Sequence, residues 1–200
     1  MKLYLNKTSP YARLVQIVVH EKGLDAEVER VWVDPWLTPE TLLAQSPFSK
    51  VPVLVVRDGL PLTESLGICD YLDEAGSGPR LMPAQGVARL AAIRKVGLGR
   101  GLIDAAFGVT IERRFHGTQN PSELAVRWLA AVNRAVERLE VDVASSPVVQ
   151  PDLGDFTIAV GLSYVKFRLP EVAWPARAPR LEQWLERLSQ RPSFTATVPE

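Results

Sequence analysis

The chain has 200 residues, of which 46% are hydrophobic and 23% are charged, and its 23 basic and 23 acidic side chains cancel. This balance gives no general field that would attract nucleic acid or a membrane surface, so we expect neither partner. No apolar run reaches the length of a membrane span, and the strand-like start has no signal-peptide pattern. A single cysteine, Cys69, fits a reducing cytoplasm, and with only two histidines we expect no metal site.

The first part of the chain begins with a strand, a helix and a second strand. Residues 2–6 and 28–33 have strand-like patterns. Between them, Ser9 is a good N-cap and Pro10 suits the first position of a helix. Elements this close in sequence predict a βαβ unit with parallel strands, and a short helix follows at about residues 38–45.

The stretch from residue 47 to residue 72 predicts a loop, a β-hairpin and a helix. Val53 to Val56 is an aliphatic run that suits a strand, and Asp58-Gly59 predicts a two-residue hairpin turn. Pro61 lacks an N–H, so the returning strand should lie at the edge of its sheet. The order βαβαββα is that of a thioredoxin-like α/β domain.

The helix after this hairpin opens with the residues Thr63-Glu64-Ser65, and its start can serve as an anion site. The first N–H groups of a helix lack internal partners and the helix dipole is positive there, so a carboxylate is favoured. Ser65 can add a hydroxyl donor. On this stretch alone, the simpler interpretation is that Thr63 or Ser65 only caps the helix.

The remainder of the chain predicts an all-helical domain. We place the α/β domain at residues 1–77, a Gly- and Pro-rich linker at residues 78–83 and the helical domain at residues 84–200. The segment at residues 156–169 is apolar on nearly every face, which predicts a buried central helix. Asn120 is expected to cap another helix, with Glu123 completing a capping box.

Glycines are scattered through the first long helical segment, at Gly97, Gly99, Gly101 and Gly108. Glycine lowers helix stability, so these positions need a reason. They can permit close packing against a neighbouring helix, or they can mark a bend.

This ordered set of segments resembles the glutathione S-transferase family. In that family, Val-Pro enters a strand through a cis peptide bond and a Glu-Ser pair begins a helix; here these are Val51-Pro52 and Glu64-Ser65. The helical half has a similar match at its buried helix, where the family has Ser or Thr and, three residues later, Asp. Here Thr157 is followed by Val160, so we expect a Thr157 cap that lacks its return hydrogen bond.

The resemblance implies that glutathione is the co-substrate and that Ser9 is the catalytic residue. In glutaredoxins the matching loop is a Cys-x-x-Cys motif, but here Ser9 and Ala12 occupy the two sulfur positions, so the chain cannot exchange dithiols at this loop. The sulfur would come from glutathione, with the Ser9 hydroxyl stabilising its thiolate. Capping the helix and donating to a thiolate are compatible roles for Ser9.

The resemblance also implies how the rest of glutathione is held. Val51 would pair its backbone with the cysteinyl part as an added strand, and Pro52 is structural. Glu64 and Ser65 would hold the γ-glutamyl end. Lys50 either meets the glycine carboxylate or is a solvated loop lysine.

The electrophile side is less determined, because each candidate also suits ordinary packing or a surface position. The candidates are Tyr11, Phe107, Ile111, Arg114 and Phe115. Trp32 and Trp36 are expected to pack rather than bind.

Two functions remain open. The first is an enzyme that transfers glutathione to a small hydrophobic electrophile, or uses glutathione in peroxide or disulfide chemistry. The second is a non-catalytic glutathione- or protein-binding module, as in starvation-response and translation-associated relatives. The resemblance further implies a homodimer, with the N-terminal half of one subunit against the helical half of the other.

Overall fold

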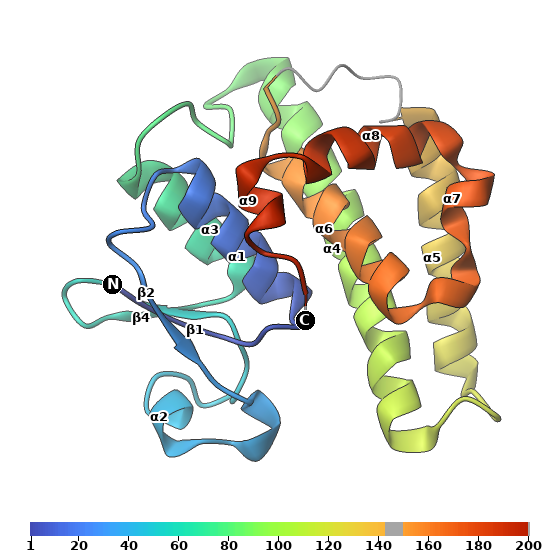
Figure 1. Cartoon of the computed structure of the whole chain (residues 1–200), viewed down its shortest axis with the longest axis horizontal. Coiled ribbons are helices and arrows are strands. Elements are labelled where there is room, and N and C mark those ends of the chain that lie inside the picture. The colour runs from blue at the N-terminus through green and yellow to red at the C-terminus, as the bar shows by residue number, and fades with distance from the viewer. Residues whose placement is uncertain (143–149, 200) are drawn as a thin grey trace. The chain divides into compact units, whose positions relative to one another are not determined.

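The computed structural model describes residues 1–142 and 150–199. The chain divides into two compact units (Figure 1). The first contains Met1–Ala84 and the segment that begins at Pro192, and the second contains Gln85–Arg191. Each unit is described by itself.

The first unit is built on a four-stranded mixed sheet, in the order β2-β1-β3-β4. The strands are β1 (Lys2–Leu5), β2 (Glu29–Trp32), β3 (Val53–Val55) and β4 (Pro61–Thr63). The β1 and β2 strands are parallel, whereas β3 is antiparallel to both β1 and β4. The helices between them are α1 (Pro10–Glu21), α2 (Glu40–Leu43) and α3 (Ser65–Ala75), with a 3-10 turn, η1 (Pro35–Leu37), after β2. The predicted order βαβαββα is therefore confirmed.

The hairpin between β3 and β4 differs from the predicted two-residue turn. The Val56 N–H donates to the Leu60 carbonyl, and the Gly59 N–H donates to the Val56 carbonyl, both at 3.0 Å. The loop therefore has three residues and ends at Gly59, whose φ of +82° lies in the left-handed region that glycine favours. The prediction that Pro61 places β4 at the sheet edge is confirmed.

Helices α1 and α3 lie on one face of the sheet and pack against each other (Figure 1). The apolar stripe of α1 is at most 1% exposed at Leu14, Ile17 and Val18. On α3, Ile68 and Leu72 are fully buried. This packing fixes the positions of both helix starts relative to the sheet.

The segment after residue 191 belongs to the first unit, although the sequence placed it in the helical domain. Its short helix α9 (Pro192–Thr195) packs on α1. Nη2 of Arg13 donates to the Phe194 carbonyl at 3.5 Å, and Oγ of Ser193 donates to Oε1 of Glu21 at 2.5 Å. Burial lowers the pKa of Arg13 to about 10. These partners are 181 and 172 residues apart, so no local pattern indicates the contact.

The predicted linker forms hydrogen bonds with the two residues of a buried ion pair between α1 and α3. Nζ of Lys22 lies 3.0 Å from Oδ1 of Asp73, and the two side chains are 1% and 3% exposed. Lys22 also donates to the Pro79 carbonyl at 3.0 Å, while Asp73 accepts the N–H groups of Leu81 and Met82 at 2.9 and 3.0 Å. Residues 79–82 are thus held by hydrogen bonds to the first unit.

The second unit is helical in its described residues. It contains α4 (Gly86–His116), α5 (Glu123–Asp142), α6 (Leu153–Arg168), η2 (Pro170–Val172), α7 (Trp174–Arg177) and α8 (Pro179–Ser189). The α6 helix packs against both α4 and α8, and α4 is its main neighbour. Most of its side chains are buried, which confirms the predicted central helix.

The long helix α4 runs without interruption through Gly97, Gly99, Gly101 and Gly108. A Cβ atom at Gly99 would lie 2.6 Å from the Ile158 nitrogen and 2.7 Å from the Thr157 carbonyl carbon. Gly99 therefore permits close approach of α4 to α6, as one of the two sequence interpretations proposed. At Gly97 and Gly101 an added Cβ would meet open space.

The start of α6 differs from the expected Thr157 cap. Oδ1 of Asp152 accepts the Asp155 N–H, and Oδ2 of Asp155 accepts the Asp152 N–H, both at 3.0 Å. This is a complete capping box one turn earlier than predicted. Thr157 lies inside the helix and its hydroxyl donates to the Leu153 carbonyl at 2.7 Å. The absent acidic residue at position 160 therefore removes no hydrogen bond.

The start of α5 is also different from the prediction. Oγ of Ser122 accepts the Ala125 N–H at 3.2 Å, so Ser122 caps the helix rather than Asn120. A serine directly before the first helical residue satisfies an N–H that has no partner within the helix.

Candidate functional site

Three segments of the first unit meet at one end of its sheet. Tyr4 in β1 lies opposite Val53 in β3, which lies opposite Thr63 in β4. The end of β1, the start of β3 and the end of β4 are therefore neighbours. As a result, the register brings Val51 and the start of α3 to the same end as the loop after β1.

Ser9 lies in that loop and caps α1. Its Oγ accepts the Ala12 N–H at 3.2 Å, and its backbone is extended, at φ −76° and ψ 120°. A hydroxyl that accepts one hydrogen bond can still donate its own proton. The predicted cap is confirmed, and donation to a thiolate stays a prediction.

The neighbouring hydroxyl of Thr8 is committed to a local turn. Both its Oγ1 and its backbone N–H donate to Oδ1 of Asn6, at 2.9 Å each. These bonds fold the loop between β1 and α1 and hold the threonine hydroxyl proton. Ser9 is therefore the better placed of the two hydroxyls to serve as a donor.

The peptide bond between Val51 and Pro52 is cis, as the resemblance implied. Pro52 and Val53 are buried, while Val51 is partly exposed. Among the residues that the structure describes, neither the N–H nor the carbonyl of Val51 forms a backbone hydrogen bond. Val51 thus presents a backbone donor and acceptor that an extended ligand can pair with.

The start of α3 is formed by Glu64 and Ser65. Glu64 has a positive φ of 75°, and its Oε2 accepts the Leu66 N–H at 3.2 Å. The cap is therefore Glu64, rather than Thr63 or Ser65. Ser65 is 2% exposed, and its Oγ lies 3.5 Å from Oε1 of Glu64. A non-glycine residue with positive φ is uncommon, and such residues cluster at functional sites.

Lys50 and Tyr11 border these segments. Lys50 is exposed on the loop directly before Val51, and Tyr11 is partly exposed in the first turn of α1. Their predicted contacts with ligands stay predictions.

The remaining electrophile candidates lie in the second unit, near the C-terminal end of α4. Phe107, Ile111 and Arg114 are spaced at i, i+4 and i+7, so they share one face of the helix. Phe107 and Ile111 are partly exposed, and Phe115 is 61% exposed. Their predicted contact with an electrophile stays a prediction.

Sequence reasoning missed a group of polar side chains between α6 and α4. Tyr164 is 4% exposed, and its neighbours include Thr110 and Arg168. Burial raises its pKa, although these two neighbours oppose the change. The available signal was a polar pair at i and i+4, Tyr164 and Arg168, on an otherwise apolar helix.

Neither a metal cluster nor a membrane-spanning helix is present in the described parts of the chain. Within residues 1–142 and 150–199, no group of three or more His, Cys, Asp or Glu side chains could hold a metal ion. No helix within those ranges is long and apolar enough to cross a membrane. Cys69 is fully buried, and burial, with the nearby carboxylates, raises the pKa of its thiol.

Solved structures of other proteins share the fold of this chain. A crystal structure of a glutathione transferase family member from Pseudomonas fluorescens Pf-5, with bound glutathione, is 30% identical, with a TM-score of 0.93 over 100% of this chain and 98% of that one. A second structure from the same organism, with bound S-(propanoic acid)-glutathione, has 29% identity, full coverage of both chains and a TM-score of 0.88.

Curated relatives also match along the whole chain. The uncharacterized GST-like protein YibF of Escherichia coli K12 is 27% identical over 100% of this chain and 98% of its own length. A stringent starvation protein A homolog of Coxiella burnetii is 28% identical over 100% of this chain and 92% of its own length.

Family models match in both units. The glutathione S-transferase N-terminal domain matches residues 8–75, and the glutathione S-transferase C-terminal domain matches residues 110–187. The N-terminal match includes the cis-proline and the Glu64–Ser65 helix start. The chain belongs to the glutathione S-transferase family.

Proposed function

We propose that this protein binds glutathione in its first unit and activates the thiol as a thiolate for attack on a small hydrophobic electrophile. The observation that carries the proposal is the position of Ser9. Its hydroxyl caps α1 and retains a proton to donate, at the end of the sheet where Val51 and the start of α3 also lie. The bound glutathione of the Pseudomonas relative supports the choice of ligand.

The residues at this end of the sheet fit the parts of glutathione. The Val51 backbone can pair with the cysteinyl residue as an added strand. The Ser65 hydroxyl and the first N–H groups of α3 suit the γ-glutamyl carboxylate, with Glu64 near the ammonium group. Lys50 is placed one residue before Val51 and can meet the glycine carboxylate.

Activation of the thiol requires a modest amount of free energy. A thiol with a pKa of about 8.5 is only a few per cent thiolate at neutral pH. Each unit of pKa lowering needs about 1.4 kcal/mol of extra thiolate stabilisation. A hydrogen bond to a charged group contributes roughly 1.5–3 kcal/mol, so donation from Ser9, aided by the α1 dipole, is sufficient for one to two units.

Glutathione binding and thiolate formation test this proposal separately. Binding is measured by calorimetry and the thiolate by ultraviolet absorbance, for the wild type, Ser9→Ala and Ser65→Ala. We expect Ser65→Ala to bind glutathione more weakly, and Ser9→Ala to bind it but lose the thiolate signal.

Thr8→Ala is the matched control, because it removes a neighbouring hydroxyl that is bonded to Asn6. We expect it to keep the thiolate signal. Wild-type protein that binds no glutathione at millimolar concentration would refute the proposal. A thiolate signal that Ser9→Ala preserves would refute the role of Ser9.

A second candidate is a non-catalytic protein-binding role. The full-length similarity to the Coxiella stringent starvation protein A homolog keeps this candidate open. Large apolar side chains are also exposed in the first unit: Trp32 is 50%, Leu37 78% and Phe48 69% exposed. Trp36 is 45% exposed, so the expectation that both tryptophans pack is wrong. Such exposed groups are typical of protein contacts. Absence of glutathione binding would favour this candidate.

The proposal includes a homodimer and a cytoplasmic location, both expected from the sequence. Sedimentation at micromolar concentration tests the dimer, and a monomer there would contradict it. Cell fractionation tests the location.

A further inference from the structure

A buried cation lies near the start of α1, the helix that Ser9 caps. Arg13 is 7% exposed, and its backbone N–H donates to the Ser9 carbonyl at 3.0 Å. It therefore follows Ser9 by one turn, on the same face of the helix. Side chains of a helix lean toward its N-terminus, so the Arg13 side chain leans over the turn that Ser9 opens. A positive charge is thus held close to the site of the Ser9 hydroxyl.

The acceptors of this guanidinium are neutral groups of the C-terminal segment, residues 192–199. Nε donates to Oγ1 of Thr197 and Nη2 to the Phe194 carbonyl, each at 3.5 Å. The guanidinium carbon lies 5.4 Å from the centroid of the Phe194 ring. Within residues 1–142 and 150–199 no carboxylate pairs with Arg13, and its lowered pKa is due to burial. The charge of Arg13 is therefore not cancelled by an adjacent anion.

The C-terminal segment runs along α1 toward the start of that helix. Ser193 donates to Glu21, the last residue of α1, whereas Phe194 and Thr197 meet Arg13, two turns earlier. Figure 1 shows α9, in red, beside α1, in blue. The α9 sequence, PSFT, has no charged side chain. The helix that covers Arg13 thus adds no charge that would oppose its field.

Other charges on α1 and on α3, which packs against it, are distant, paired or exposed. On α1, His20 and Glu21 lie in the last turn. Asp73 of α3 pairs with Lys22, beyond the far end of α1. The remaining carboxylates of α3 and its cap are exposed: Glu64, Asp70 and Glu74. Solvent screens exposed charges, whereas it screens a buried charge much less.

We propose that Arg13, held by the C-terminal segment, is a second source of thiolate stabilisation at the start of α1. This inference rests on the proposed function, in which glutathione places its sulfur at Ser9. A nearby positive charge favours an anion, and the low dielectric around a buried charge lengthens its range. Ser9 donates a hydrogen bond to the sulfur, whereas Arg13 acts through its field and does not touch it. The segment after residue 191 thereby supports the chemistry of the first unit.

A thiol introduced at position 9 measures this field without glutathione. Ser9→Cys is alkylated with iodoacetamide over a range of pH, and the dependence of the rate on pH gives the pKa of the introduced thiol. Cys69 does not interfere, because it is fully buried and burial raises its pKa. Adding Arg13→Met should raise the pKa of the introduced thiol by about one unit, so its thiolate fraction falls about tenfold below that pKa.

Two further variants separate the charge of Arg13 from its packing. Arg13→Lys keeps the charge and should leave the pKa of the introduced thiol close to its value in Ser9→Cys alone. Thr197→Asp leaves the arginine in place and puts a carboxylate where its Nε now meets a hydroxyl. It should raise the pKa of the introduced thiol by about one unit. Thr197→Asp decides the question if Arg13→Met does not fold.

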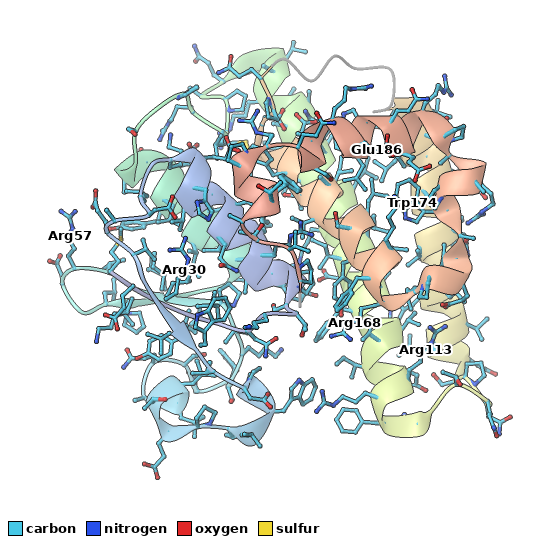
Figure 2. The ribbon with its side chains drawn as sticks, in the orientation of Figure 1. Arg30, Arg57, Arg113, Arg168, Trp174 and Glu186 are labelled. Carbon is cyan, nitrogen blue, oxygen red and sulfur yellow. The ribbon has the colours of Figure 1, made fainter. Side chains whose placement is uncertain are left out.

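Each charge change has a matched control in the first unit. Thr195→Asp adds the same charge two residues away at an exposed position, and should shift the pKa of the introduced thiol much less than Thr197→Asp does. Arg57→Met removes a cation whose side chain is 71% exposed and paired with Glu27. Figure 2 shows Arg57 projecting from the loop after β3. We expect this variant to leave the pKa of the introduced thiol unchanged.

The thiolate of bound glutathione is then followed by ultraviolet absorbance in the Arg13 and Thr197 variants that retain Ser9. Its pKa should change in the same directions. An introduced thiol whose pKa is unchanged by Arg13→Met or by Thr197→Asp would overturn the proposal. Arg13→Lys that raises the pKa as much as Arg13→Met would also overturn it, because the charge would then not be the cause. Failure of the wild type to bind glutathione would refute the proposed function alone, since the introduced thiol reports on Arg13 independently.

Discussion

Lys22 at the end of α1 and Asp73 in α3 form an ion pair of 3.0 Å that is almost completely buried. Removing one member of such a pair leaves the other charge buried without compensation. We therefore expect Asp73→Asn to lower the free energy of unfolding by about 3–5 kcal/mol, measured by denaturant titration. A loss below about 1 kcal/mol would show that the pair is not buried in solution.

The matched control for this substitution is Glu74→Gln. Glu74 pairs with Arg80 at 3.2 Å, and the two side chains are 74% and 51% exposed. Exposed ion pairs contribute about 0–1 kcal/mol, so we expect a change within that range. The two substitutions are adjacent on one helix and differ in burial.

Asp73 should also make stability depend on acid pH. Burial raises the pKa of Asp73, but the Leu81 and Met82 N–H groups and Lys22 lower it more, so the pKa in the folded protein is below the ordinary value. A lowered folded-state pKa stabilises the protein above the unfolded-state pKa of about 3.9, and this contribution is lost as pH falls. Unfolding curves from pH 7 to pH 3 should show the wild type losing its advantage over Asp73→Asn. Parallel curves would contradict the assignment.

The capping box of α6 predicts that stability depends on Asp152, and not on the acidic residue that the family has at position 160. Asp152→Ala removes the acceptor for the Asp155 N–H and a 2.6 Å ion pair with Lys95, so it should cost about 1–2 kcal/mol. Val160→Asp introduces the family's acidic residue, but Val160 is fully buried, so we expect destabilisation rather than a better cap. Thermal unfolding of both variants is the measurement. A stabilising Val160→Asp would restore the original expectation of a cap at Thr157.

The glycines of α4 should respond in opposite directions to alanine. Gly99→Ala places a Cβ within 2.6 Å of the α6 backbone and should destabilise by about 1–3 kcal/mol. Gly101→Ala meets open space and gains helix propensity, which should stabilise by up to about 1 kcal/mol. Denaturant unfolding compares the two. A Gly99→Ala substitution that stabilises the protein, as Gly101→Ala should, would show that α4 and α6 are not in close contact at Gly99.

The sequence predicted the elements of the first unit because their signals are local. Ser9-Pro10 identified a helix start, and Pro61 identified an edge strand. The candidate site depended on such local signals together with the resemblance, which supplied the cis bond before Pro52. The details that failed, such as the caps at Asn120 and Thr157, required a choice between neighbouring polar residues that suit the same role.

Contacts between distant segments could not be predicted from the sequence. Nothing near Arg13 indicates that its partner is Phe194, 181 residues away. This contact depends on the packing of whole segments, which one sequence does not specify by periodicity.

The docking of α9 on α1 makes the helical unit an insertion within the first unit. During synthesis, the ribosome completes the whole of α4 to α8 before Phe194 can reach Arg13. The thioredoxin-like part therefore remains incomplete until its last element, α9, has been synthesised. A fragment that stops at residue 84 would leave the Arg13 guanidinium without these acceptors, so an excised α/β half is a less complete folding unit than its strand and helix order suggests.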